Sequence, residues 1–131
     1  MTGFMLDTDI SSYIIKRRPA SLAEKFQKHA DSLCVSVMTA AELRFGAQKA
    51  GRPQLAALVE GYLERLAILD WTDSVTTHHA RIRWALERAG KPIGNMDLLI
   101  ASHALSQRLT LVTNNLRHFS SVPGLSVQAW A

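Results

Sequence analysis

Short apolar runs alternate with longer segments of helical period along this chain, and this alternation restricts the possible folds more than any other feature. The runs suited to β-strands lie at residues 4–6, 33–37, 67–71 and 109–113, with a short last strand at 126–130. Segments of helical period lie between them, at 9–17, 19–30, 39–49, 54–66, 73–89 and 96–108. Because a helix that connects two strands must pack on the sheet, the pattern predicts an α/β fold: a three-layer α/β/α sandwich around a central, mainly parallel sheet.

Residues with special backbone preferences mark several of the expected helix ends. Pro19 suits the first turn of the second helix, and Gly90 suits the position after the 73–89 helix. Asp73 and Asn95 are expected to cap the helices that follow them, because their side-chain oxygens can accept hydrogen bonds from free backbone N–H groups. No internal repeat or linker is visible, so the sequence predicts one domain over residues 1–131.

Composition indicates an ordinary globular protein. With 47% hydrophobic residues, a chain of 131 residues can bury roughly two-thirds of its unfolded surface. The one cysteine, Cys34, falls in an expected buried strand, which predicts an inert thiol, no disulfide framework and a reducing cytoplasm as the setting. No segment approaches the roughly 20 apolar residues that a membrane span requires, and no signal peptide is visible. We therefore expect an unexported protein with no membrane association.

The charge balance favours a polyanionic partner. The chain carries 15 Lys and Arg against 11 Asp and Glu, a net charge of +4. If several carboxylates gather in one site, the remaining surface is more basic still and attracts phosphate backbones in a salt-dependent way. The alternative is a solvated basic surface without a partner.

Four acidic or amide side chains stand at corresponding places in the predicted fold. Asp7 ends the first strand, Glu42 and Asp97 lie near the starts of helices, and Asn115 follows the 109–113 strand. In a parallel sheet the carboxyl ends of the strands lie along one edge, where ligands bind. The four side chains are therefore expected to face one site.

Each of these residues also has an ordinary structural explanation. Thr39 and Glu42 have the spacing of a capping box, in which the carboxylate only reaches back to the helix start. Asp97 would gain roughly 0.3 to 1 kcal/mol from the helix dipole. Asp7 and Asn115 are common turn residues. The set is more informative than its members, because convergence on one edge requires something to offset the repulsion between the charges.

That repulsion favours a bound cation. Two unit charges about 4 Å apart repel by about 4 kcal/mol at an effective dielectric constant of about 20, so three carboxylates in contact would cost on the order of 10 kcal/mol. A retained proton, a paired Lys or Arg, or a divalent cation could offset this. We favour the cation, and oxygen ligands suit Mg²⁺ or Mn²⁺ rather than zinc. A bound metal would also neutralise an approaching phosphodiester and activate water.

The chain resembles the PIN-domain endoribonucleases, and among them the VapC toxins of bacterial toxin–antitoxin pairs. The resemblance covers essentially the whole chain. It rests on four segments and the residues beside them: Met5-Leu6-Asp7-Thr8-Asp9; Thr39-Ala40-Ala41-Glu42-Leu43 with Gly46; Gly94-Asn95-Met96-Asp97 followed by Leu98-Leu99-Ile100-Ala101-Ser102-His103-Ala104; and Leu111-Val112-Thr113-Asn114-Asn115 with Phe119 and Pro123-Gly124.

The resemblance implies an α/β/α sandwich in which acidic residues hold Mg²⁺ or Mn²⁺. Asp7 and Asp97 would be direct ligands, and Glu42 would complete the shell or orient water. Thr113 would support the site through its hydroxyl, and Asn115 stands where many relatives carry a further Asp, which puts a permanently filled second metal site in doubt. Asp9 stands where Asn is common, and either adds a charge or caps the first helix.

The resemblance also implies a reaction and partners. RNA phosphodiesters would be hydrolysed by metal-activated water to 5′-phosphate and 3′-hydroxyl ends. The similarity to enterobacterial-type VapC implies initiator tRNA, cut in its anticodon stem-loop, as the substrate, with arrest of translation. A VapB-type antitoxin would block the acidic groove, and the toxin would form a homodimer through helices within residues 9–30 and 54–66. Candidate RNA contacts are Lys16, Arg17, Arg18, Arg44 and Lys91.

Other chemistry finds little support in the sequence. His78 and His79 are adjacent on a helix and point about 100° apart, unlike the i, i+4 pair of a helical zinc site. His103 is expected to be packed or hydrogen-bonded, and Trp71, Trp84 and Trp130 are assigned to the core or an interface. Two other functions remain open: a non-catalytic binding partner in a DNA-bound repressor complex, and a nuclease that acts on DNA.

Overall fold

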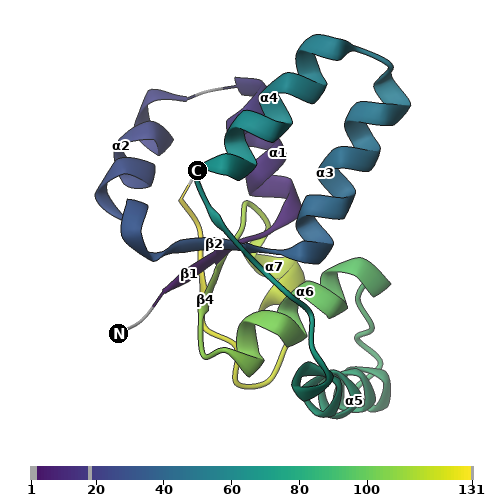
Figure 1. Cartoon of the computed structure of the whole chain (residues 1–131). Helices are drawn as coiled ribbons and strands as arrows, with labels where there is room; N and C mark the ends of the chain where they lie inside the picture. Colours follow the sequence, from purple (N-terminus) through teal and green to yellow (C-terminus); the bar gives the residue numbers. More distant parts are fainter. Residues whose placement is uncertain (1–2, 18, 131) are drawn as a thin grey trace.

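A parallel sheet lies at the centre of the protein (Figure 1). The computed structural model describes residues 3–17 and 19–130, and within them the sheet has five strands in the order β3-β2-β1-β4-β5, with every neighbouring pair parallel. The strands are β1 (Phe4–Leu6), β2 (Leu33–Ser36), β3 (Ala67–Leu69), β4 (Thr110–Val112) and β5 (Val127–Gln128). All five predicted strands are confirmed, although most are shorter than expected.

Helices cover both faces of this sheet and complete the predicted three layers (Figure 1). One face packs against α1 (Thr8–Arg17), α2 (Ala20–Lys28), α3 (Val37–Ala50) and α4 (Pro53–Glu64). The other face packs against α5 (Asp73–Arg88), α6 (Asn95–Ser106) and the short α7 (Leu116–Phe119). A 3-10 turn, η1 (Ala30–Ser32), leads into β2. The sequence patterns did not predict η1 or α7.

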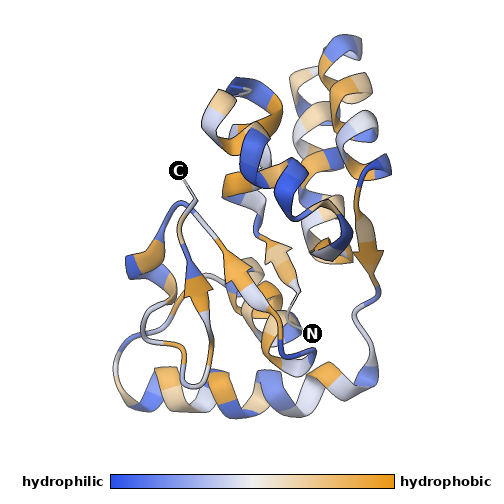
Figure 2. Cartoon of the chain, turned by 90° about the vertical axis from the view of Figure 1, so that its left-hand side faces the viewer, coloured by the Kyte–Doolittle hydropathy of each residue, from blue (hydrophilic) through white to orange (hydrophobic). Residues whose placement is uncertain are grey.

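The strands are buried on both sides, as a parallel sheet between two helical layers requires. Met5 and Leu111 belong to the cluster under α5 and α6, whereas their neighbours Leu6 and Val112 belong to the cluster under α1 to α4. Successive side chains of a strand point to opposite faces, so one short apolar run supplies both clusters. Figure 2 shows the strands as hydrophobic and the outer helix α5 as mixed.

Three of the predicted helix starts are wrong in detail. The side chain of Ser36 accepts a hydrogen bond from the Met38 N–H, so α3 begins two residues before Thr39. Asp73 and Asn95 are the first residues inside their helices, and neither helix has a side-chain cap. Thr72 and Gly94 occupy the cap positions before these two helices. Each predicted cap residue therefore lies one position inside its helix.

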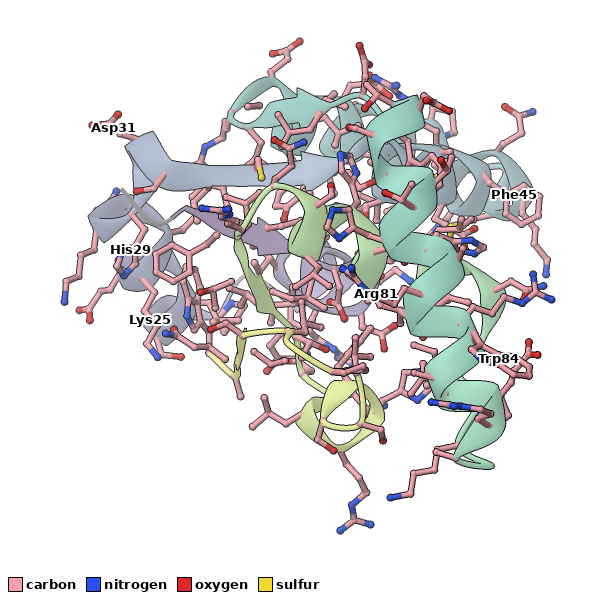
Figure 3. All side chains as sticks on the ribbon, turned by 90° about the horizontal axis from the view of Figure 1, so that it is seen from below. Lys25, His29, Asp31, Phe45, Arg81 and Trp84 are labelled. Carbon is pink, nitrogen blue, oxygen red and sulfur yellow. The ribbon has the colours of Figure 1, made fainter. Side chains whose placement is uncertain are left out.

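The three tryptophans differ in environment. Trp130 is buried, and Trp71 is half-buried with its indole N–H donating to the Leu99 carbonyl at 3.0 Å. Trp84 is 61% exposed and projects from α5 (Figure 3), so it is not a core residue. Cys34 is buried, and burial raises the pKa of its thiol to about 12, in agreement with the predicted inert thiol.

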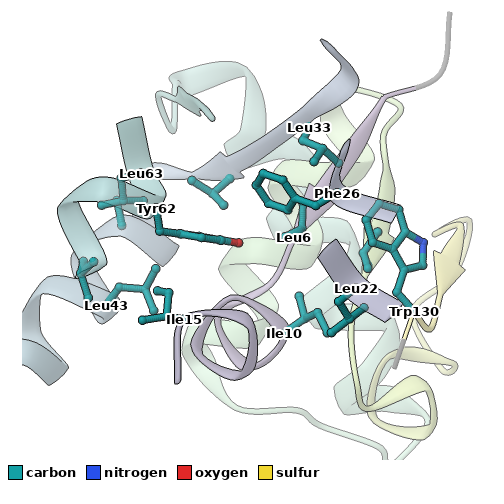
Figure 4. Close-up of a cluster of buried hydrophobic side chains, with 14 of the residues drawn as sticks. Leu6, Ile10, Ile15, Leu22, Phe26, Leu33, Leu43, Tyr62, Leu63 and Trp130 are labelled. Carbon is teal, nitrogen blue, oxygen red and sulfur yellow. The ribbon is translucent and has the colours of Figure 1, made fainter. Parts of the chain in front are cut away.

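Two buried hydrogen bonds join elements that are distant in the sequence. The Tyr62 hydroxyl on α4 donates to Ser11 Oγ on α1 at 2.8 Å, within the apolar cluster drawn in Figure 4. On the other face of the sheet, His103 Nδ1 on α6 lies 2.8 Å from Ser36 Oγ at the end of β2. Burial lowers the pKa of His103 and favours the neutral ring. His103 is thus hydrogen-bonded within the core, as predicted.

Within the described part of the chain, no helix is both long enough and apolar enough to cross a membrane.

Candidate active site

Asp7 is a buried carboxylate at the carboxyl end of the central strand. It directly follows β1, and its side chain is almost inaccessible, with 1% of the residue exposed. Its Oδ1 accepts a hydrogen bond of 2.8 Å from the Ile10 N–H, so this carboxylate caps α1. Asp9 is exposed and lies within α1, so the alternative that Asp9 caps this helix is wrong.

Burial dominates the acidity of Asp7. Loss of hydration raises its pKa from 3.8 to about 6, although hydrogen bonds from the Ile10 backbone and the Thr113 side chain act in the opposite direction. The charges of Asp9 and Asp97 make smaller contributions to this rise in pKa. The structure therefore brings Asp7 and Asp97 within electrostatic reach of each other, as the sequence predicts.

Asp97 is a more accessible carboxylate in the first turn of α6. Its side chain is 37% exposed, and its Oδ2 lies 2.8 Å from Nε2 of His118. Burial raises the pKa of Asp97, the nearby His118 lowers it, and the charge of Asp9 raises it. Asp97 is thus partly exposed, and His118 holds its carboxylate in one orientation. This arrangement suits a carboxylate that binds a metal ion arriving from solvent.

His118 is a residue of this site that the sequence reasoning missed. It lies on α7, a helix of four residues directly after Asn115, and packs edge-on against Phe119 at 5.3 Å between ring centroids. A helix of one turn has too few residues to show a period, so nothing in the apolar pattern indicated it. The available signal was position, because His118 follows the same strand end as Thr113 and Asn115.

The remaining predicted site residues lie around the two aspartates. Thr113 is fully buried, and its hydroxyl accepts a hydrogen bond of 3.0 Å from the Asn115 N–H. Asn115 itself is exposed and precedes α7. Glu42 lies on α3 and lines a hollow together with Thr8 and Lys16, and its charge is not among those that shift the pKa of Asp7 or Asp97.

Glu42 is not part of a capping box. Thr39 is fully buried and receives a hydrogen bond of 3.3 Å from the Thr8 hydroxyl, while the cap of α3 is three residues earlier at Ser36. The capping explanation for Thr39 and Glu42 is therefore wrong. The Thr8–Thr39 hydrogen bond instead joins the start of α1, just after Asp7, to the first turn of α3, just before Glu42.

The site fits a hard divalent cation coordinated partly by water. Within residues 3–17 and 19–130, no three acidic, histidine or cysteine side chains lie close enough together to hold a metal by themselves. Mg²⁺ is usually held by one or two carboxylates and keeps several of its waters. Asp7 and Asp97 supply two carboxylates whose pKa values are raised mainly by burial, and a bound cation would stabilise their charged forms.

Comparison with known proteins assigns the chain to a family. The family model described as "PIN domain" matches residues 4–125. The tRNA(fMet)-specific endonuclease VapC of Shigella flexneri is 42% identical over 100% of both chains, and ribonuclease VapC2 of Haemophilus influenzae is 44% identical over 99% of both. The crystal structure of DNA-bound VapBC from Salmonella typhimurium contains a chain that is 40% identical, with a TM-score of 0.97 over 100% of both chains.

The family match spans most of the chain, and the structural match covers the whole fold. Nucleases of the PIN family generally depend on a divalent metal, which agrees with the carboxylate arrangement at the end of β1. The resemblance inferred from the sequence motifs is confirmed. The chain belongs to the PIN-domain family, among its VapC ribonucleases.

Proposed function

We propose that this protein is the endoribonuclease toxin of a toxin–antitoxin pair, formed as a single PIN domain over residues 1–131. The observation that carries the proposal is the desolvated Asp7 beside Asp97 at the carboxyl edge of the sheet. Asp7 also caps α1, but a cap does not require a buried carboxylate, and strongly raised pKa values cluster at functional sites. The identity of 42–44% with VapC ribonucleases supplies the reaction class.

The proposed cofactor is Mg²⁺, with Mn²⁺ as a substitute. Asp7 and Asp97 would be the direct protein ligands, and Glu42 would complete the shell or orient a water from the α3 side. When bound, the metal supplies positive charge to the scissile phosphate and lowers the pKa of an attacking water. Hydrolysis would leave a 5′-phosphate and a 3′-hydroxyl.

The chain's own residues would keep this arrangement in place. The Ile10 N–H holds Asp7 at a fixed angle, and His118 holds Asp97. Thr113 supports Asp7 from the neighbouring strand, and its hydroxyl also fixes the backbone of Asn115 at the rim of the site. A ligand held by neighbouring groups loses less conformational freedom when the metal and substrate bind.

The proposed substrate is initiator tRNA, cut in its anticodon stem-loop, with arrest of translation as the result. The name of the Shigella flexneri relative, a tRNA(fMet)-specific endonuclease, supports this choice. The proposed partner is a VapB-type antitoxin, supported by the Salmonella typhimurium VapBC structure. We further propose a homodimer, a hetero-oligomer with the antitoxin, and a cytoplasmic location, where tRNA is found.

Partner-free protein tests the proposal directly. It should be incubated with total tRNA and Mg²⁺, with EDTA and the variants Asp7→Asn and Asp97→Asn as controls. We expect one main cut in initiator tRNA, and loss of cleavage in all three controls. Exchange of Mg²⁺ for Mn²⁺ should preserve the position of the cut.

Other outcomes point to the competing functions. Cleavage that persists in EDTA and in both variants contradicts the metal site. Cleavage of single-stranded DNA but of no RNA identifies a DNA-directed nuclease, which shares the same phosphate chemistry. If the metal-loaded protein cuts nothing and does not arrest growth on expression, a non-catalytic role in a DNA-bound repressor complex is the better explanation. The Salmonella typhimurium VapBC structure shows that such a complex can bind DNA.

A further inference from the structure

A basic hollow lies beside the candidate metal site. Lys91 and Ile93, from the loop between α5 and α6, form one wall, and Asn115, Arg117 and His118 form the other. His118 belongs to both places, because its Nε2 contacts Oδ2 of Asp97 at 2.8 Å. The hollow therefore begins directly next to one proposed metal ligand.

The lining of this hollow suits an anion. Lys91 and Arg117 contribute two cationic groups. The rest of the lining is polar at Asn115, His118 and Ser121 and apolar at Pro92 and Ile93. The two cations are far apart in the sequence but line the same hollow, because α6 and β4 return the chain to this edge of the sheet. Both residues are exposed, so they can reach a ligand in solvent.

Other basic residues are paired with carboxylates or line hollows that do not include His118. Two hydrogen bonds of 2.9 Å join Arg44 to Glu60, and Arg83 is paired with Glu87 at 2.9 Å. Lys16 lines one hollow with Glu42 and another with Arg17 and Arg52, and neither hollow includes His118. Arg17, another predicted RNA contact, lies at the end of α1, and Arg18 lies outside the described residues. Of the five predicted contacts, Lys91 alone lines the hollow that reaches His118.

We propose that Lys91 and Arg117 form a subsite for a phosphate of the RNA strand next to the scissile phosphate. The subsite rests on the proposed nuclease function and specifies how the substrate is held. Asp7 and Asp97 create a negative edge that repels RNA when no metal is bound, and the two cations place attraction at its border. Guanidinium and ammonium groups are the usual phosphate ligands of proteins, and Arg117 can bind phosphate oxygens through two parallel hydrogen bonds.

The test compares two variants that lose the same charge. Lys91→Ala/Arg117→Ala removes the subsite. Lys25→Ala/Lys28→Ala removes two exposed lysines from the last turn of α2, which precedes the amino end of β2, at the opposite edge of the sheet. Figure 3 shows Lys25 on the side of the molecule away from α5. Both variants carry Asp7→Asn in the binding assays, so that RNA is not consumed.

Binding of a tRNA anticodon stem-loop should be measured in Mg²⁺ at several salt concentrations. We expect about tenfold weaker binding for the subsite variant, and a slope of log affinity against log salt that is smaller by about 1. The control pair should change affinity by less than about threefold. With Asp7 restored, the subsite variant should raise KM and leave kcat within about threefold of the wild-type value.

Equal affinity and salt slope for the two variants would overturn the subsite. Unchanged RNA binding combined with weaker antitoxin binding would overturn it too, and would reassign the cations to the carboxylates of a protein partner. If the wild-type protein cuts no nucleic acid but the binding difference is present, the nuclease proposal fails and the subsite stands. If cleavage is normal and the difference is absent, the nuclease stands and the subsite fails.

Discussion

Replacing Asp7 by Asn is expected to make the metal-free protein more stable while it removes cleavage. Asp7 is 1% exposed, and burial is the main cause of its raised pKa of about 6. The charged carboxylate is therefore unfavourable in the folded protein at neutral pH. Asn has nearly the same shape, carries no charge, and its side-chain oxygen can still accept the hydrogen bond from the Ile10 N–H.

The size of the effect follows from the difference in pKa between the folded and unfolded states. A rise from 3.8 to about 6 corresponds to about 3 kcal/mol, since one pKa unit is about 1.4 kcal/mol. Between these two values the folded state binds more protons than the unfolded state, so stability falls as the pH rises. The cost is absent below about pH 4 and fully present above about pH 7. For a chain of this size, 3 kcal/mol corresponds to a shift in Tm of about 10 °C.

Thermal and urea unfolding should be followed at several pH values from 4 to 8, in EDTA, for the wild type and Asp7→Asn. We expect equal stabilities near pH 4 and a growing advantage for Asp7→Asn toward pH 7. Asp31→Asn is the matched control, because Asp31 is exposed in η1, and its stability should stay within about 0.5 kcal/mol of wild type. Added Mg²⁺ should stabilise the wild type and have little effect on Asp7→Asn.

A less stable Asp7→Asn at pH 7 in EDTA would refute the reasoning, because it would show that the charge of Asp7 stabilises the fold. A constant difference between pH 4 and pH 8 would also refute it, since a pKa shift must produce a pH-dependent one.

Three further substitutions test two buried hydrogen bonds and one exposed ion pair. Ser36→Ala removes the cap of α3 and leaves Nδ1 of buried His103 without its partner. Urea unfolding should show a loss of about 2 to 3 kcal/mol in the free energy of unfolding, and a loss under about 0.5 kcal/mol would contradict the hydrogen bond. Tyr62→Phe leaves a buried hydroxyl on α1 unpaired and should cost about 1 to 2 kcal/mol by the same assay, and an unchanged midpoint would count against it. Arg44→Ala breaks an exposed ion pair with Glu60 and should leave the midpoint of unfolding nearly unchanged, whereas a large drop would show that the pair is structural.

The fold could be predicted from the sequence because its strands are buried on both faces. Runs such as Phe4–Leu6 and Thr110–Val112 are continuously apolar or nearly so, and the long helices between them have clear periods. The helix starts were harder, because several residues near each start are able to cap. Ser36, not Thr39, caps α3, while the Thr39 hydroxyl is hydrogen-bonded to Thr8, a contact between distant segments that local sequence does not predict.

The site was predictable to the extent that position in a parallel sheet determines it. Asp7 and Asp97 converge as expected, because a strand end and a helix start at the same edge must lie close together. Side-chain pairing was not predictable. The contact between His118 and Asp97 depends on the direction in which a four-residue helix leaves the sheet, and no periodic pattern encodes that direction.

The position of β1 in the middle of the sheet has a consequence for synthesis of the protein. This strand precedes the other four, yet one of its two partners is β4, with Phe4 opposite Thr110. A growing chain can pair β1 with β2 early but cannot pair its other edge until β4 has been made, and such distant pairings form slowly. Thr113, which supports Asp7, arrives at the same late moment. The candidate site is therefore assembled only after β4 has been synthesised, so a chain that stops before β4 does not carry it.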